Sequence, residues 1–157
     1  MDVFRLHREG LNPASGEGAA IYGGRWNHKN FSVVYCAESR SLGVLESVVH
    51  LVRLPINYCL TVFSIPKSVP IEIVDAVSLS KGWDGPITTS VTQDIGTEWL
   101  KSMRSAVLRI PAVVIEGEFN YLLNPRHSDF SSITILPSRP FRFDARLRPP
   151  TVLKEIL

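Results

Sequence analysis

Three side chains suited to holding a ring-containing, phosphate-bearing ligand lie close together in the sequence. Arg25 follows two glycines in Gly23-Gly24-Arg25-Trp26-Asn27, Tyr35 ends an apolar run, and Glu46 lies in an otherwise apolar stretch. Glycines let a backbone turn tightly and approach a ligand, and arginine binds an anion with a planar fork of donors. A carboxylate on an apolar element is costly to bury without a partner or a role. The three residues therefore suggest a pocket for such a substrate.

Each of these residues also has an interpretation without a ligand. Glu46 could lie on a solvated helix flank, and Arg25 could bond the carbonyls of a loop. Tyr35 could be a core residue with a satisfied hydroxyl. Trp26 could stack on a base or simply fill the loop.

The elements that position these residues follow from the hydrophobic pattern. Strands are expected at Val3 to Leu6, Phe31 to Ala37, Asn57 to Ile65 and Ile71 to Val74, and later at Ala112 to Ile115, Ile133 to Leu136 and Pro140 to Phe143. Loops are expected at Glu9 to Asn30, Gly82 to Thr89 and Asn120 to His127.

Two helices complete the prediction. Ser39 is a plausible N-cap for a helix whose apolar stripe is Leu42, Leu45, Val49 and Val52, closed by Pro55. Ser90 and Gln93 form a predicted capping box for a second helix that runs to about Arg104. Many short strands with two solid helices indicate an α+β fold, a compact mixed-sheet domain, and 157 residues indicate a single domain over 1–157.

Composition excludes several classes. A formal net charge of +2 and the lack of interleaved aromatic and basic residues argue against direct nucleic-acid binding. No apolar run approaches the ~20 residues of a membrane span, and the chain begins without a signal-like segment, so we expect no membrane association and a cytoplasmic protein. The four histidines show no metal-ligand spacing, so we expect no metal site.

Several blocks of the sequence resemble the RES domain family, which is named for an arginine, a glutamate and a serine. The first blocks are Ser15 to Ala19, Gly23 to Asn27, Val33 to Tyr35 and Leu42 to His50. The closing blocks are Asn120-Tyr121-Leu122-Leu123-Asn124-Pro125-Arg126-His127 and Phe141 to Leu147. The resemblance runs from about Phe4 to Leu147.

The resemblance implies a fold akin to ADP-ribosyltransferases and the toxin of a bacterial toxin–antitoxin pair. Such toxins destroy NAD⁺ by hydrolysis or phosphorolysis, and some transfer ADP-ribose to a protein, so NAD⁺ is a substrate and no cofactor is implied. By position, Arg25, Tyr35 and Glu46 match the family's catalytic residues, while Arg5, Gly23 and Trp26 match positions that line the dinucleotide pocket. The implied partner is an Xre-like DNA-binding antitoxin that covers the active site, and a homodimer within that complex is compatible with the resemblance.

One position departs from the family pattern. Where the family serine follows a proline, this chain has Pro111-Ala112, so Ala112 occupies the serine's place in the expected substrate site. Either this member works without the hydroxyl, or the alanine is a replacement that weakens a toxic protein. Three functions remain open: an NAD⁺ glycohydrolase or phosphorylase, a mono-ADP-ribosyltransferase acting on a host protein, and a catalytically impaired module that binds NAD⁺ and the antitoxin.

Overall fold

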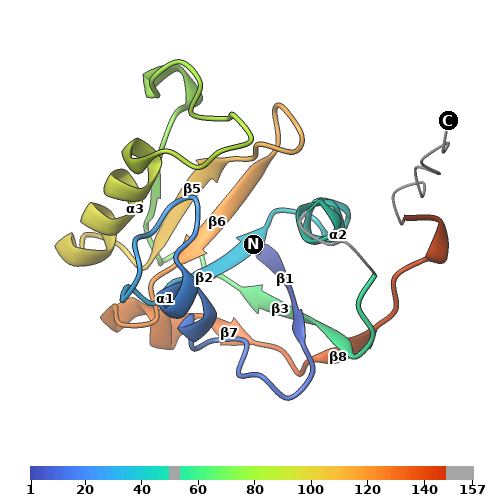
Figure 1. The fold of residues 1–157 in the computed structure, drawn as a ribbon. Helices are drawn as coiled ribbons and strands as arrows, with labels where there is room; N and C mark the ends of the chain where they lie inside the picture. The colour runs from blue at the N-terminus through green and yellow to red at the C-terminus, as the bar shows by residue number, and fades with distance from the viewer. Residues whose placement is uncertain (50–53, 148–157) are drawn as a thin grey trace, which may run out of the picture.

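The computed structural model describes residues 1–49 and 54–147, which form one mixed sheet with short helices packed on it (Figure 1). Its strands are β1 (Asp2–Arg8), β2 (Val34–Ala37), β3 (Tyr58–Ser64), β4 (Ile71–Ile73), β5 (Val107–Pro111), β6 (Phe119–Leu123), β7 (Thr134–Ile135) and β8 (Arg139–Phe141). Its helices are α1 (Glu17–Tyr22), α2 (Arg40–Val48) and α3 (Ser90–Ser102), with 3₁₀ turns at Ala76–Ser78, Ser128–Ser132 and Ala145–Leu147. This architecture confirms the predicted α+β class.

The sheet order is β4-β5-β6-β2-β1-β3-β7, with β8 also paired to β3. Only the β4–β5 pair is parallel among these strands. The long central pairings therefore join segments that are distant in the sequence, such as β2 with β6 and β1 with β3.

The most important difference from the sequence-based prediction is β6. The expected loop at Asn120 to His127 is wrong over its first half, because Phe119–Leu123 is a strand between β5 and β2. The Asn124-Pro125 pair does mark a turn, but it follows the strand, and the run of large apolar residues before it fills the centre of the sheet.

Other elements of the structure also differ from the sequence-based prediction. The strand expected at Ala112 to Ile115 is wrong, because β5 ends at Pro111. The loop expected from Glu9 to Asn30 contains the short helix α1, which buries no residue and so leaves no apolar stripe in the sequence. The predicted N-cap Ser39 is confirmed, since its Oγ accepts the Leu42 N–H at 3.0 Å, while Val52 lies outside the described residues.

Side-chain alternation gives the sheet two different faces. On one face, Leu108, Ile110 and Leu122 pack against α3 through Trp99 and Leu100. The same face carries Ala37, which packs with Leu42 of α2 and with Ala112. The opposite face holds the larger cluster, which includes Val3, Val34, Phe63, Val107 and Leu123. Both main helices therefore lie on one face of the sheet, at separate places along it, as Figure 1 shows.

Helix α3 approaches the segment before β2 unusually closely. A Cβ added at Gly96 would overlap the carbonyl oxygen of Trp26. The predicted Ser90–Gln93 capping box is not formed, because Thr89 is the N-cap and the Gln93 amide instead donates to Gly24 O at 2.9 Å. The face of α3 that carries Gly96 and Gln93 therefore holds the Gly-Gly-Arg-Trp turn against the helix.

Candidate active site

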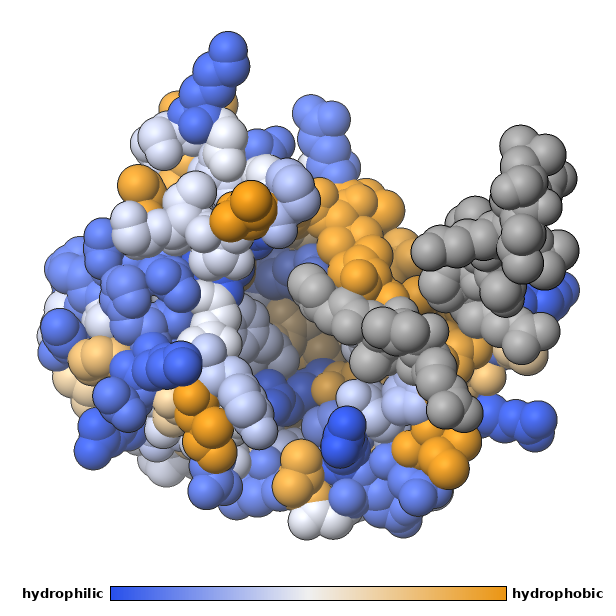
Figure 2. All heavy atoms as spheres, in the orientation of Figure 1, coloured by the Kyte–Doolittle hydropathy of each residue, from blue (hydrophilic) through white to orange (hydrophobic). Residues whose placement is uncertain are grey.

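A cavity of about 980 Å³ opens on the helix-covered face of the sheet, between α2 and α3. Figure 2 shows the molecule hollowed in this region. Its wall comes from β1 and β2, the α1–turn segment 18–26, helix α2, the loop before α3, and the ends of β5 and β6. Pockets of about 300–1,000 Å³ hold drug-sized ligands and cofactors, so this one is large enough for an extended ligand.

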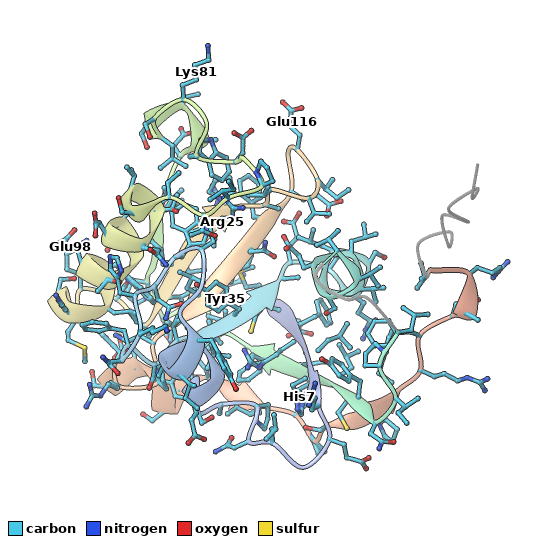
Figure 3. The ribbon with its side chains drawn as sticks, viewed as in Figure 1. His7, Arg25, Tyr35, Lys81, Glu98 and Glu116 are labelled. Atoms are coloured by element: carbon cyan, nitrogen blue, oxygen red, sulfur yellow. The ribbon has the colours of Figure 1, made fainter. Side chains whose placement is uncertain are left out.

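Six of the seven residues predicted for the site line this cavity. They are Arg5, Gly23, Arg25, Trp26, Tyr35 and Glu46. In Figure 3, Arg25 and Tyr35 lie between the α3 side of the molecule and α2. The geometry brings together residues from β1, the turn, β2 and α2 around one cavity.

The turn that carries Arg25 is held by a buried amide. Asn27 is fully buried, and its Nδ2 donates to the carbonyls of Ala19, His28 and Phe31 at 2.9 to 3.1 Å. Its Oδ1 accepts the hydroxyl proton of Tyr35 at 2.8 Å. One asparagine therefore ties together the end of α1, the turn and strand β2.

Tyr35 supports the same turn from the sheet. Its hydroxyl accepts the Trp26 N–H at 3.0 Å in addition to donating to Asn27. Burial raises the pKa of this phenol well above its usual value, although the Trp26 N–H acts in the opposite direction. A Cβ at Gly24 would lie 2.6 Å from the Tyr35 hydroxyl, so only glycine fits there. Tyr35 is thus a neutral hydrogen-bonding group at neutral pH.

Arg25 contacts the loop that precedes α3. Its Nη1 donates to Trp83 O and its Nη2 to Gly85 O, both at 2.8 Å. This is the carbonyl-bonding arrangement that the sequence left open as the alternative to anion binding. The guanidinium group of Arg25 therefore links the Gly-Gly turn to loop 82–89. This loop supplies Gly85, Pro86 and Thr88 to the cavity wall.

Glu46 enters the cavity from α2. Its Oε1 accepts a hydrogen bond from Asn120 Nδ2 at 2.6 Å, and both residues line the cavity. The side chain is half-buried and paired with a neutral amide, so it does not lie on a solvated helix flank. The arrangement places a carboxylate beside an open volume, where it can accept hydrogen bonds or face developing positive charge.

Arg5 lies at a fork in the sheet. Strands β1 and β2 pair only at Phe4 and Ala37, and beyond that point Arg5 Nη1 donates to Tyr35 O at 3.2 Å. Strand alternation places its side chain on the face of Cys36 and Thr61, opposite Tyr35. Burial lowers the pKa of Arg5, and Nε has no partner among the described residues. Arg5 is therefore a half-buried cation that lines the cavity where β1 and β2 separate.

Two of the three remaining predicted residues, Trp26 and Ala112, are buried. Trp26 is 2% exposed and packs with Trp99 in the core, and its ring lies 6.1 Å from that of Trp83. Ala112 does not reach the cavity wall. Its position two residues beyond Ile110 puts it beneath α2, where it contacts Leu42 and Ala37. Ala112 therefore packs between the sheet and α2, next to the lining residues Pro111 and Val113.

Sequence reasoning missed three amides that build the site. Asn27 donates to backbone carbonyls around the turn, and Gln93 donates to the carbonyl of Gly24 within it. Asn120 donates to Glu46. Gln93 and Asn120 bond partners far away in the chain, so no local spacing could indicate them. Within the described part of the chain, no three His, Cys, Asp or Glu side chains are grouped to hold a metal ion, and no helix is long and apolar enough to span a membrane.

Comparison with known proteins places this geometry in a family. The family model described as RES domain matches residues 2–144. A relative from Sphingobium sp. (strain YBL2), named "Prs ADP-ribosylating toxin", is 39% identical over 137 residues, which is 85% of each chain. A "Toxin Res" from Photorhabdus laumondii is 37% identical over 152 residues, covering 94% of this chain and 97% of the relative.

A solved structure shares the fold. The toxin–antitoxin complex MbcT–MbcA of M. tuberculosis contains a chain that matches with a TM-score of 0.71 at 18% identity, covering 89% of this chain and 83% of that one. At that identity the match speaks for the fold alone. With the family model spanning nearly all of the described residues and two relatives well above 30% identity over most of their length, the chain belongs to the RES domain family.

Proposed function

We propose that this protein is the toxin of a toxin–antitoxin pair and that it consumes NAD⁺ by breaking the nicotinamide–ribose bond. The observation that carries the proposal is the fixed carboxylate of Glu46 at the wall of a 980 Å³ cavity. Breaking this bond builds positive charge on the ribose, and a fixed carboxylate stabilises that charge. The curated relatives named as toxins, one of them as ADP-ribosylating, support the same assignment.

The residues around Glu46 suit the rest of such a substrate. Arg25 and Arg5 both line the cavity, and their positive charge suits a ligand that carries a pyrophosphate. A two-pronged bond from Arg25 to a phosphate requires the guanidinium to leave the carbonyls of Trp83 and Gly85. Tyr35, held neutral by burial, contributes a rigid wall beside the ribose end.

The acceptor of the ADP-ribosyl group is water, phosphate or a protein side chain. The printed name of the Sphingobium relative favours a protein acceptor as the second candidate. The third candidate is a module that binds NAD⁺ and an antitoxin without turnover. These three differ in their products, which makes them separable by direct analysis.

The test is mass analysis of NAD⁺ incubated with the protein, with and without inorganic phosphate. Nicotinamide with ADP-ribose indicates hydrolysis, and nicotinamide with ADP-ribose 1″-phosphate in phosphate buffer indicates phosphorolysis. Label from adenine-labelled NAD⁺ that enters a protein of a bacterial lysate indicates transfer. Binding of NAD⁺ without nicotinamide release leaves only the binding module.

Glu46→Gln is the decisive variant, because it keeps the shape and removes the charge. Its turnover should fall by orders of magnitude, as expected for a contact made in the transition state. Glu17→Gln, at an exposed position in the first turn of α1, is the matched control and should keep wild-type turnover. If Glu46→Gln turns NAD⁺ over as fast as this control, the proposed mechanism is wrong.

We also propose that an Xre-like DNA-binding antitoxin covers the mouth of the cavity. The rim exposes large apolar side chains: Tyr22 is 78% exposed, Val49 55% and Ile87 80%. Tyr22 and Val49 line the cavity, and Ile87 lies between the lining residues Pro86 and Thr88. Exposed apolar residues grouped at one site mark an interaction surface. Ile87→Ser should keep nicotinamide release while weakening inhibition by the proposed antitoxin, and unchanged inhibition would exclude this part of the rim.

A further inference from the structure

The pairing of Glu46 with Asn120 joins a helix on one face of the sheet to a strand inside the sheet. Glu46 lies on α2, a helix of nine residues, and Asn120 lies on β6, 74 positions later in the chain. The Nδ2–Oε1 distance of 2.6 Å is short for an amide donating to a carboxylate.

Asn120 is held in place from both sides. Its Cα partner on β2 is Ala37, and its partner on β5 is Ile110, so its backbone is paired on both sides near one end of the ladder. Strand alternation puts its side chain on the same face as Leu122, toward α2 and the cavity. A short amide on such a strand has little freedom.

Glu46 has more freedom without this partner. Helix α2 is seated on the sheet one turn earlier, where Leu42 is buried against Ala37 and a Cβ at Gly43 would meet the Ala37 side chain at 3.6 Å. Glu46 itself carries three rotatable bonds beyond that seat. A glutamate that samples several rotamers loses the fixed geometry that electrostatic catalysis requires.

The chemistry of the two groups settles the direction of the bond. An ionised carboxylate only accepts, so the amide nitrogen of Asn120 must donate. One carboxylate oxygen is then fixed by the sheet, and the second accepts no hydrogen bond from the residues that the structure describes. We propose that Asn120 is a positioning residue that fixes the Glu46 carboxylate for its contact with the ribose; this rests on the proposed NAD⁺-cleaving function.

A positioning role differs measurably from a purely structural one. If Asn120 only stabilised the fold, its loss would lower the unfolding temperature and leave turnover by the folded protein intact. If it bound substrate directly, its loss would raise KM. A positioning residue lowers kcat with KM nearly unchanged, because the contact it perfects is made in the transition state.

The first experiment measures nicotinamide release by wild type and Asn120→Leu, which is similar in size but has no donor. We expect kcat to fall about 10- to 100-fold, the equivalent of one hydrogen bond to a charged group, with KM changed less than about threefold. Wild-type protein that releases no nicotinamide would end the proposed function. If wild type is active and Asn120→Leu is equally active, the positioning role is excluded. It is also excluded if Asn120→Leu changes only KM and not kcat.

Asn120→Asp provides a rescue that a structural role would not show. At neutral pH this variant places two carboxylates side by side and has no donor, so it should be as impaired as Asn120→Leu. As the pH falls, the pair takes up a shared proton and regains an O–H donor. The kcat of Asn120→Asp relative to Asn120→Leu should therefore rise toward acidic pH, and a constant ratio would overturn the assignment.

The pairing can also be tested without a substrate. In the double variant Glu46→Gln/Asn120→Asp, the new amide of residue 46 can donate to the carboxylate at 120, which restores the bond in the reverse direction. Its unfolding temperature should exceed that of Asn120→Asp alone, while nicotinamide release stays lost. The double variant's change in stability is compared with the sum of the changes in the two single variants. If the two are equal, residues 46 and 120 do not interact in solution, and the inference fails regardless of the protein's activity.

Discussion

Gly96 of α3 lies directly against the carbonyl of Trp26, so closely that a Cβ at residue 96 would overlap the oxygen. Glycine inside a helix costs about 1 kcal/mol relative to alanine, and in this helix the contact with the turn explains why it is there. Glycine at this position lowers the intrinsic stability of the helix but allows the Gly-Gly-Arg-Trp turn to pack against it.

Gly96→Ala should therefore destabilise the protein in spite of its better helix propensity. We expect a net loss of about 1–3 kcal/mol in the free energy of unfolding, as for an overpacked core, measured by chemical denaturation. Gly18→Ala is the matched control, because Gly18 is also helical and a Cβ there meets nothing within 4 Å. This control should be neutral or stabilising by up to about 1 kcal/mol, and a similar gain in Gly96→Ala would refute the contact.

Tyr35→Phe should loosen the turn. The change removes a hydroxyl that accepts from Trp26 N–H and donates to Asn27 Oδ1, and it leaves both groups without that partner in a buried site. The expected loss is about 1–3 kcal/mol in unfolding free energy, together with weaker NAD⁺ binding. Tyr22→Phe, at a residue that is 78% exposed, should change stability by no more than about 0.5 kcal/mol. Equal changes in the free energy of unfolding in the two variants would mean that the Tyr35 hydroxyl does not stabilise the fold.

Arg25→Lys should weaken NAD⁺ binding although it conserves the charge. Lysine cannot span the carbonyls of Trp83 and Gly85 with one planar group, so loop 82–89 loses its fastening. Calorimetry measures the affinity, and hydrogen exchange measures protection in the loop. Faster exchange with unchanged affinity would make Arg25 a purely structural residue, whereas weaker binding with an unchanged loop would indicate a direct contact with the anion.

Cys36 should make the protein lose stability in alkaline solution. Burial raises the pKa of this thiol to about 12, against about 8.5 in an unfolded chain, even though Arg5 beside it favours the thiolate. Between these values the unfolded state releases a proton that the folded state keeps, so stability is full below pH ~8.5 and falls as the pH rises, by up to about 1.4 kcal/mol per pH unit.

Cys36→Ala removes this dependence while leaving every tyrosine in place. Denaturation at pH 8 and pH 10 in the presence of a reductant should show a decline about 1–2 kcal/mol larger in wild type than in the variant. Parallel declines would show that the thiol is accessible to solvent in the folded protein.

Ala112→Ser should not increase turnover. The side chain packs against Ala37 and Leu42 beneath α2 and does not line the cavity, so an added hydroxyl cannot reach the substrate directly. It should instead cost about 1–3 kcal/mol of stability if it finds no partner in this apolar site. Paired measurements of nicotinamide release and of thermal unfolding check both points. A clear rise in nicotinamide release by Ala112→Ser would support the interpretation that the alanine weakens the activity of this protein.

The sequence predicted the parts of the fold that rest on local patterns. The seven-residue strand β3 alternates buried and half-buried residues, and α2 begins at the serine cap that the pattern indicated. Strand β6 was not predictable in the same way, because Asn120 and Tyr121 suggest a turn until Ala37 and Ile110 are known to flank them.

The site shows the same division. Arg25, Tyr35 and Glu46 could be found from residue type and family resemblance, and all three line one cavity. Their supports could not, because Asn120 and Gln93 act on partners more than 60 positions away. Only the strand expected to begin at Ala112 is wrong, because β5 ends at Pro111, and the role of Ala112 in the site stays a prediction.

The position of β6 has a consequence for synthesis of the chain. Strands β1, β2, β3 and β5 all leave the ribosome before Phe119, yet β6 is the strand that joins β2 to β5 and carries the partner of Glu46. Until β6 is made, no strand joins β2 to β5, and Asn120 is missing from the wall of the cavity between α2 and α3. A nascent or prematurely ended chain thus remains without a site, so that any toxicity this protein has begins only once about three quarters of it has been translated.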